Sequence, residues 1–274
     1  MPAEPGIDYY DGPDLVPAVV AAIEAAGLSA DRLDSDDLAA LDEFHALGRA
    51  ATVALARLAA IRPGERVVDV GAGIGGPARA LARHFGARVT AVDPVGRFCA
   101  LNRLLTERTG LGDRVEVRQA SGRRLPFPDG SFDVAWSQAV WPNVPDKAAH
   151  AAEIARVLRP GGRLALHEVV AGPGGPIEYP VPWAEGPRES FLVGELELRD
   201  LLESAGFETD VWQDRAAMQR GLEAALAGGR GMAAGHPDLS LTAILPDLDE
   251  RMAVVGRNVA DQRIGLVSAL LVRR

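Results

Sequence analysis

The residues best suited to hold a nucleotide-like ligand lie between positions 67 and 79. The apolar run Val67–Val70 precedes a stretch in which four glycines fall within the six residues 71–76. A turn of this kind lets a ligand come close to the backbone, because no Cβ stands in the way. Three of the glycines fit G-x-G-x-x-G, and Asp93 ends the next predicted strand, where a ribose-binding acid belongs. This match alone is a weak indication of a nicotinamide cofactor.

Three further features argue against a pyrophosphate at this turn. Asp69 stands two residues before the first glycine, where its carboxylate would repel a phosphate but suit a ligand with an ammonium group. The sequence LPFPDGSFD at 125–133 leads into a later predicted strand, and RVLRPGG at 156–162 leads into the next. The chain also ends in a strand that follows a long excursion, as a final antiparallel hairpin requires.

Together these motifs resemble the class I S-adenosylmethionine-dependent methyltransferases, with the expected order and spacing over about residues 65–213. The segments GIGGPAR (73–79), PFPDGSFDVAWSQ (126–138) and VPDK (144–147) resemble small-molecule enzymes of the sarcosine/dimethylglycine N-methyltransferase and ubiquinone/tocopherol type. The segment DEFHALGRAATVALA, residues 42–56, is similar to the helix that closes over the cofactor in bacterial members.

The resemblance implies that the glycine turn holds the methionyl end and ribose of S-adenosylmethionine. Asp69 would face the amino-acid moiety, and Asp93 would accept hydrogen bonds from both ribose hydroxyls. One position departs from the family, since Ser121 stands where an acid usually receives the adenine amino group, a loss of about 1 kcal/mol of affinity. The implied cofactor-binding residues are Asp69, Gly71, Ala72, Gly73, Gly75, Asp93, Pro94, Ser121, Gly122, Arg123 and Ser137.

The acceptor is expected beyond the carboxyl ends of the strands. Many relatives have Ser-Gln-His where this chain has Ser137-Gln138-Ala139, so the family's histidine is absent. His167 is the replacement candidate for a catalytic base, and a satisfied core histidine is an equally weighted alternative. Because a sulfonium is an activated methyl donor, positioning the acceptor alone can lower the reaction barrier by roughly several kcal/mol without a base. The predicted acceptor contacts are Tyr10, His45, Gln138, Trp141, Asn143 and Trp183.

The elements that must position these residues alternate from residue 65 onward. Predicted strands are 66–70, 88–93, 114–118, 132–137, 163–170, 207–212 and 264–272, and predicted helices are 77–85, 95–109, 146–158 and 195–205. This alternation implies a parallel sheet covered on both faces. Residues 13–60 are predicted helical, with one apolar face along 38–58, and 171–189 are predicted irregular.

We therefore predict an α/β fold: a Rossmann-like, seven-stranded, mostly parallel sheet with helices on both faces and an antiparallel last strand. One methyltransferase domain, 1–274, is expected. It would comprise a helical lid (1–62), a cofactor-binding core (63–213), a helical insertion (214–262) and a final strand (263–274).

Charge and cysteine content narrow the partners and the location. The formal net charge is −9, and residues 1–60 hold eleven acidic and three basic side chains. A chain without a basic patch is not expected to bind nucleic acid or an anionic membrane. A single cysteine, Cys99, and no apparent signal or membrane segment favour a cytoplasmic protein. Neither a metal site nor an oligomeric state is indicated, and a homo-oligomer is left open.

The leading hypothesis is methyl transfer from S-adenosylmethionine to a small molecule of secondary metabolism. The first alternative keeps the cofactor but catalyses a non-methylating step such as cyclisation. The second is a nicotinamide-dependent oxidoreductase, which would bind NAD more tightly than S-adenosylmethionine.

Overall fold

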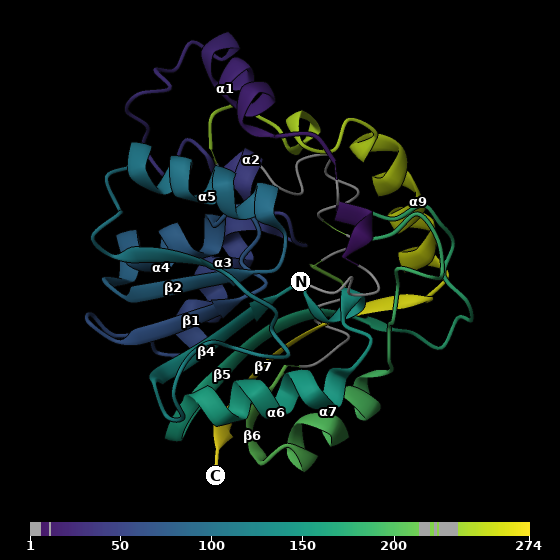
Figure 1. Cartoon of the computed structure of the whole chain (residues 1–274). Coiled ribbons are helices and arrows are strands. Elements are labelled where there is room, and N and C mark those ends of the chain that lie inside the picture. Colours follow the sequence, from purple (N-terminus) through teal and green to yellow (C-terminus); the bar gives the residue numbers. More distant parts are fainter. Residues whose placement is uncertain (1–6, 11, 214–219, 222–223, 225–234) are drawn as a thin grey trace.

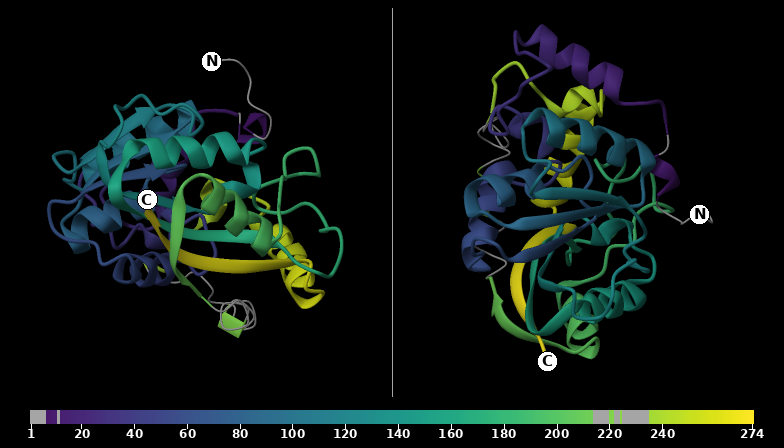
Figure 2. Two further views of the ribbon diagram at one scale, coloured as in Figure 1. Left: turned by 90° about the horizontal axis from the view of Figure 1, so that it is seen from below. Right: turned by 60° about the vertical axis from the view of Figure 1, so that its left-hand side comes forward.

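The computed structural model describes residues 7–10, 12–213, 220–221, 224 and 235–274. Seven strands form one sheet in the order β3-β2-β1-β4-β5-β7-β6 (Figures 1 and 2). Their bounds are β1 Arg66–Val70, β2 Arg88–Asp93, β3 Val115–Gln119, β4 Phe132–Gln138, β5 Leu158–Ala171, β6 Phe207–Trp212 and β7 Ile264–Arg273.

Strand direction confirms the predicted fold class. β1 pairs in parallel with β2 and β4, β2 with β3, and β4 with β5, whereas β7 is antiparallel to both β5 and β6. The order along the sheet reverses between β1 and β4. In open α/β sheets the carboxyl ends of the strands at such a switch point form the ligand crevice.

Helices cover both faces of the sheet. Side chains of α3 and α4 pack with one face, whereas those of α6 and α7 pack with the other and lie below the sheet in Figure 1. α5 packs against β2 and β3. The bounds are α3 Gly48–Leu58, α4 Gly76–Phe85, α5 Gly96–Arg108, α6 Lys147–Val157 and α7 Glu195–Ser204.

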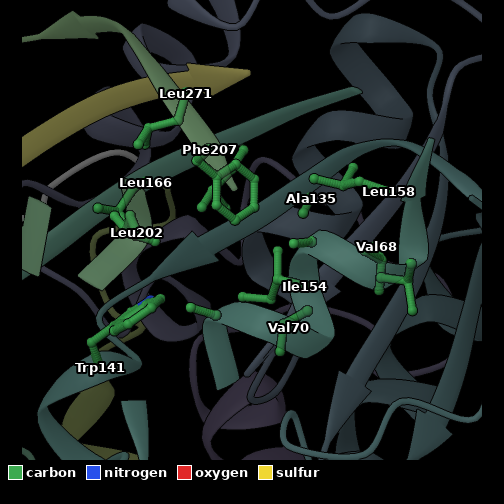
Figure 3. Close-up of a cluster of buried hydrophobic side chains, with 14 of the residues drawn as sticks. Val68, Val70, Ala135, Trp141, Ile154, Leu158, Leu166, Leu202, Phe207 and Leu271 are labelled. Atoms are coloured by element: carbon green, nitrogen blue, oxygen red, sulfur yellow. The ribbon is translucent and has the colours of Figure 1, made fainter. Parts of the chain in front are cut away.

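Strand alternation decides which side chains can reach which helices. Val68 and Val70 join the core beneath α6, together with Ile154 and Phe207 (Figure 3). Since successive strand residues point to opposite faces, Asp69 lies on the side of α3 and α4. The same rule puts Gln138 on the α3 side of β4 because Trp136 packs there.

The N-terminal part is less helical than predicted. It contains η1 (Asp8–Tyr10), α1 (Val16–Ala25), α2 (Ala39–Asp42) and α3. The expectation of one helix over 38–58 is wrong, because the chain leaves the helix at Glu43 and re-enters it after Leu47, whose φ is +67°. Buried polar contacts of Glu43, described below, hold this break, and residue periodicity carries no signal of them.

The predicted insertion, 214–262, lies partly outside the described residues. Its described part contains η3 (Leu241–Ala243) and α9 (Leu248–Ala260), while η2 (Trp141–Asn143) follows β4. Among the helices of the described residues, none combines the length and apolarity needed to cross a bilayer.

Candidate functional site

The turn after β1 requires glycine at two positions. The φ angles of Gly71 and Gly75 are +81° and +89°, a region that side chains disfavour. A Cβ at Gly71 would lie 2.4 Å from Val140 Cγ2, and one at Gly75 would lie 2.1 Å from Asn102 Oδ1. A Cβ on Gly73 would meet no atom within 4 Å. The turn is therefore tightly packed against the segment that follows β4 and against α5, but open at Gly73.

Asp93, at the carboxyl end of β2, is tied to the glycine turn. Its Oδ2 accepts the backbone N–H of Gly73 at 2.8 Å, and its Oδ1 accepts that of Val95 at 2.9 Å. Burial raises the pKa of Asp93 to about 6, although the two backbone hydrogen bonds act in the opposite direction. Each carboxylate oxygen retains a second lone pair, so the group can still accept hydrogen bonds from a ligand.

Asp69, at the end of β1, is a buried acid with an unsatisfied oxygen. Its Oδ2 has no hydrogen-bond partner within the described chain. Burial raises the pKa of Asp69 to about 8, and the nearby carboxylates of Asp93 and Glu43 add to this effect. A ligand that brings positive charge or an N–H donor would relieve both conditions.

These groups line one cavity, which we name the cofactor cavity. Its empty volume is about 1130 Å³, the solvent-open mouth included. Of the predicted cofactor residues, its lining includes Asp69, Gly71, Ala72, Gly73, Asp93, Pro94, Ser121, Gly122 and Arg123. Of the predicted acceptor contacts, its lining includes Tyr10, His45, Gln138 and Asn143.

A second cavity, which we name the apolar cavity, shares a wall with the first. Tyr10, Phe44, His45 and Ala139 line both. Its empty volume is about 940 Å³, open solvent included. The rest of its lining comes from the segments after α2, η2, β5 and η3, from α9 and from β7: Ala46, Leu47, Pro142, Val169, Pro182, Trp183, Leu241, Leu248, Met252, Val255, Ile264, Gly265 and Leu266.

Glu43 anchors the segment that separates the two cavities. It is fully buried, and its Oε2 contacts His45 Nε2 and Thr52 Oγ1, each at 2.7 Å. Arg49 also donates to it. Although burial favours the neutral acid, the contacts with His45, Arg49 and Thr52 lower the pKa of Glu43 to about 2. The carboxylate therefore stays ionised and fixes residues 43–47 onto α3.

Asp42 brings a third carboxyl group to the cofactor cavity. Its Oδ2 accepts from Arg79 Nη2 at 2.8 Å, and both side chains are fully buried. Its Oδ1 has no hydrogen-bond partner among the described residues, and burial raises the pKa of Asp42 to about 6. The pair joins the N-terminal segment to the start of α4.

Some predicted site residues line neither cavity. Ser137 lies on the opposite face of β4, where its Oγ donates to Glu168 and accepts from Trp141 Nε1. Trp141 is part of the hydrophobic core drawn in Figure 3. Gly75 faces Asn102 instead of open space. Successive strand residues point to opposite faces, so Ser137 and Gln138 cannot both reach the cofactor cavity. The sequence alone does not reveal which face of β4 meets that cavity, and so the prediction wrongly includes Ser137.

His167 also lies outside both linings. Its Nδ1 is 2.6 Å from Ser268 Oγ, and its Nε2 is 3.2 Å from the carbonyl oxygen of Ala46. Burial, with His45 nearby, lowers the pKa of His167 to about 3. Both ring nitrogens are occupied, a geometry that matches the core-histidine alternative, so we assign His167 no role as a base.

Among the lining residues that sequence reasoning missed are Asp42, Phe44 and His150. Asp42 and Phe44 lie inside the resembling segment 42–56 and could have been selected from it. His150 lies on α6, where helix periodicity suggests only packing; burial lowers its pKa to about 4, so it is neutral at pH 7.

Comparison with known proteins gives a family match within the chain. Residues 68–166 match the family model described as a methyltransferase domain. The match runs from within β1 to within β5 and includes the glycine turn.

Individual relatives extend the comparison. The chain is 37% identical over 134 residues to the methyltransferase GfsG of Streptomyces halstedii, covering 49% of this chain and 48% of that protein. It is 38% identical over 111 residues to a glycine/sarcosine/dimethylglycine N-methyltransferase of Actinopolyspora halophila, covering 40% of this chain and 20% of that protein. The sarcosine/dimethylglycine resemblance is thus confirmed, although the chain spans less than half the length of these curated relatives.

Solved structures confirm the fold over the whole chain. Haemonchus contortus phosphoethanolamine N-methyltransferase 2, in complex with S-adenosylhomocysteine, superposes with a TM-score of 0.73 at 21% identity, covering 100% of this chain and 61% of that one. The [4+2]-cyclase SpnF superposes with a TM-score of 0.67 at 24% identity, covering 100% and 98%.

Proposed function

We propose that this chain transfers a methyl group from S-adenosylmethionine to a small-molecule acceptor. The observation that carries the proposal is the pair of adjoining cavities, one lined by carboxyl groups and a glycine turn, the other apolar. Two ligands seated in them would meet at the shared wall of Tyr10, Phe44, His45 and Ala139. The methyltransferase domain over 68–166 supports the same reading.

The residues present fit this cofactor. Asp69 Oδ2 is buried without a partner and would pair with the ammonium group of the methionyl moiety. Asp93 would hold the ribose hydroxyls, and the open space beside Gly73 leaves room for the ligand. Asp93 and Asp42, whose pKa values of about 6 leave them mostly ionised at pH 7, would instead repel a pyrophosphate, which argues against the nicotinamide alternative.

The chain's own contribution is positioning. When bound, S-adenosylmethionine supplies a methyl group already activated by its sulfonium. The shared wall orients the acceptor toward the cofactor cavity, and the apolar lining excludes water. Alignment alone is worth up to roughly 7–11 kcal/mol in well-oriented systems, so no dedicated base is needed.

The proposal also covers the type of acceptor, the partners and the location. The acceptor belongs to secondary metabolism, and neither nucleic acid nor a membrane is a partner. The protein is cytoplasmic, in keeping with its one free cysteine, Cys99. The division into lid, core, insertion and final strand within one domain stays a prediction.

The first experiment is calorimetric titration with S-adenosylhomocysteine and, separately, with NAD. Asp93→Ala removes both the ribose acceptor and the anchor of Gly73, so we expect its affinity for S-adenosylhomocysteine to fall at least 100-fold. Asp200→Ala, an exposed acid on α7, is the matched control and should bind normally. Unchanged affinity in Asp93→Ala, or tighter binding of NAD, would refute the assignment.

Cyclisation is the second candidate, because a [4+2]-cyclase superposes along its whole length. Both candidates use the same cofactor cavity. A product heavier by one methyl group, formed together with S-adenosylhomocysteine, favours methyl transfer; an isomer of the substrate favours cyclisation.

A further inference from the structure

The described lining of the apolar cavity has no charged side chain and leaves no side-chain hydrogen-bond donor free for a ligand. Its described lining contains no Asp, Glu, Lys or Arg. The hydroxyl of Tyr10 donates to Asn143 Oδ1 at 2.9 Å, and the indole of Trp183 donates to Ser190 Oγ at 3.0 Å. His45 is bound to Glu43. A charged group seated here would lose its hydration without compensation, so the cavity favours an uncharged, hydrocarbon-rich ligand.

Gln138 offers a free donor beside this cavity. It is 7% exposed, lines the cofactor cavity, and immediately precedes Ala139, which lines both. Its Nε2 is buried and has no hydrogen-bond partner within the described chain. The amide nitrogen can only donate, so a ligand oxygen is the natural partner.

The orientation of this amide is fixed by its neighbours. Gln138 Oε1 accepts the indole N–H of Trp136 at 2.8 Å and lies 3.1 Å from Thr52 Oγ1. An indole nitrogen cannot accept a hydrogen bond, so turning the amide over would set two donors against each other. Nε2 therefore stays directed away from Trp136 and keeps its hydrogen-bonding capacity unused.

The location of Gln138 favours the acceptor over the cofactor as the source of that oxygen. Thr52 Oγ1, next to Gln138 Oε1, is also 3.1 Å from His45 Nε2, and His45 belongs to the wall shared by both cavities. The ammonium-binding candidate Asp69 lies at the end of the neighbouring strand and aligns with Trp136, two residues earlier on β4. Gln138 therefore lies further along β4 than the position level with Asp69, on the side of the apolar cavity.

We propose that the acceptor is an uncharged, largely apolar molecule with an oxygen at or beside its methylated atom, and that Gln138 Nε2 donates a hydrogen bond to this oxygen. The proposal rests on the proposed function and narrows its substrate class. It favours oxygen methylation, or carbon methylation next to a carbonyl or enol, over methylation of an amine. In either case the acceptor's oxygen or carbon bonds to the methyl group as the methyl–sulfur bond breaks, and the acceptor's proton leaves to solvent at the open mouth of the cofactor cavity.

The test uses naphthalene probes on the full chain, with and without S-adenosylhomocysteine. 2-Acetylnaphthalene carries the oxygen, and 2-isopropenylnaphthalene has the same shape without it. We expect the ketone to bind at least fivefold more tightly, by competition fluorescence. 2-Naphthoate and 2-naphthylmethylammonium should each bind at least tenfold more weakly than the ketone.

Variants locate the donor. Gln138→Met keeps the side-chain volume and should reduce the ketone preference to about one, with the hydrocarbon probe and S-adenosylhomocysteine binding as before. If it fails to fold, the double variant Trp136→Phe/Gln138→Met removes the indole donor as well and serves instead. Gln213→Met, which makes the same change after β6 and outside both linings, is the matched control and should keep the preference.

Each other outcome overturns the proposal. A preference near one in the unmodified protein, or a preference that survives in both Gln138 variants, removes Gln138 as the donor. Loss of S-adenosylhomocysteine affinity with the preference intact assigns Nε2 to the cofactor carboxylate. Tight binding of a charged probe contradicts the apolar cavity. Failure of S-adenosylhomocysteine to bind at all overturns the proposed function separately, since the probe preference is also measured without it.

Discussion

At the scale of single residues, Asp69 links ligand binding to protonation. Its raised pKa, about 8, means that the ligand-free protein holds this acid largely protonated at pH 7. A cationic ligand beside it would favour the ionised form and lower that pKa. Binding should therefore release a proton.

This linkage predicts a pH-dependent affinity. Between pH 6.5 and 8 the affinity for S-adenosylhomocysteine should rise with pH, by at most about tenfold per unit, and level off above pH 8. Asp93 and Asp42 have pKa values of about 6 and titrate below this window. Calorimetry in buffers of different ionisation enthalpy would count the released proton. A flat profile, or one that Asp69→Asn leaves unchanged, would contradict the role of Asp69.

The same residue should weaken the ligand-free fold at alkaline pH. Because its folded pKa is raised above the unfolded value, its contribution to stability is complete below about pH 4 and is lost as the pH rises through about 8. We expect the Tm of the ligand-free protein to fall between pH 6.5 and 8 and to level off above pH 8, and Asp69→Asn to reduce that fall. Thermal denaturation across this range checks it; an equal fall in both proteins would exclude Asp69 as the cause.

At the scale of elements, Arg79 holds three helices together. It is fully buried on α4, donates to Asp42 at the end of α2 and to the carbonyl of Ile74, and lies 3.2 Å from Asn102 Oδ1 on α5. Arg79→Leu removes the hydrogen-bonded partner of the buried Asp42 and leaves it only Arg49, whose Nη2 is 3.7 Å away, so the change should cost about 3 kcal/mol of unfolding free energy. Arg83→Leu removes an exposed pair with Asp34 on the same helix and should cost less than about 1 kcal/mol. Denaturant titrations compare the unfolding free energies of the two variants. Equal losses of unfolding free energy would show that the buried pair stabilises the fold no more than the exposed pair does.

Local patterns sufficed for the strands and for the helices that follow them, because each carries its own apolar run and its own Pro or Gly boundary. They failed where distant contacts decide. The helix break at 43–47 depends on the hydrogen bond between Glu43 and Thr52 on the next helix. The occupied Nδ1 of His167 depends on Ser268, which lies 101 residues later in the chain. Ser137 and Gln138 are adjacent in sequence, yet only the assembled sheet shows which of them faces the cofactor cavity.

At the scale of the whole molecule, three segments that are distant in sequence meet beside the cavities: the N-terminal segment at Tyr9, the loop at Val181 and Pro182, and α9. Tyr9 donates to the carbonyl of Pro182, and the Arg251 guanidinium on α9 lies 5.8 Å from the Tyr9 ring centroid. Arg251 also donates to the carbonyl of Val181 at 2.9 Å. Tyr10, next to Tyr9, lines both cavities, so ligands bound there should favour these contacts.

Ligand binding should therefore raise the free energy of unfolding of the whole chain and slow hydrogen exchange in its N-terminal segments. At a concentration of S-adenosylhomocysteine 100 times its Kd, linkage adds about 2.7 kcal/mol, which for a chain of this size corresponds to a rise in Tm of roughly 5–10 °C. Hydrogen exchange should slow most in residues 39–47, which carry Asp42 and His45 to the cavity, and little in α7 on the opposite face of the sheet. Asp93→Ala should show neither change. Uniform slowing across the sheet, with 39–47 exchanging as before, would mean that the cofactor binds without engaging the N-terminal segment.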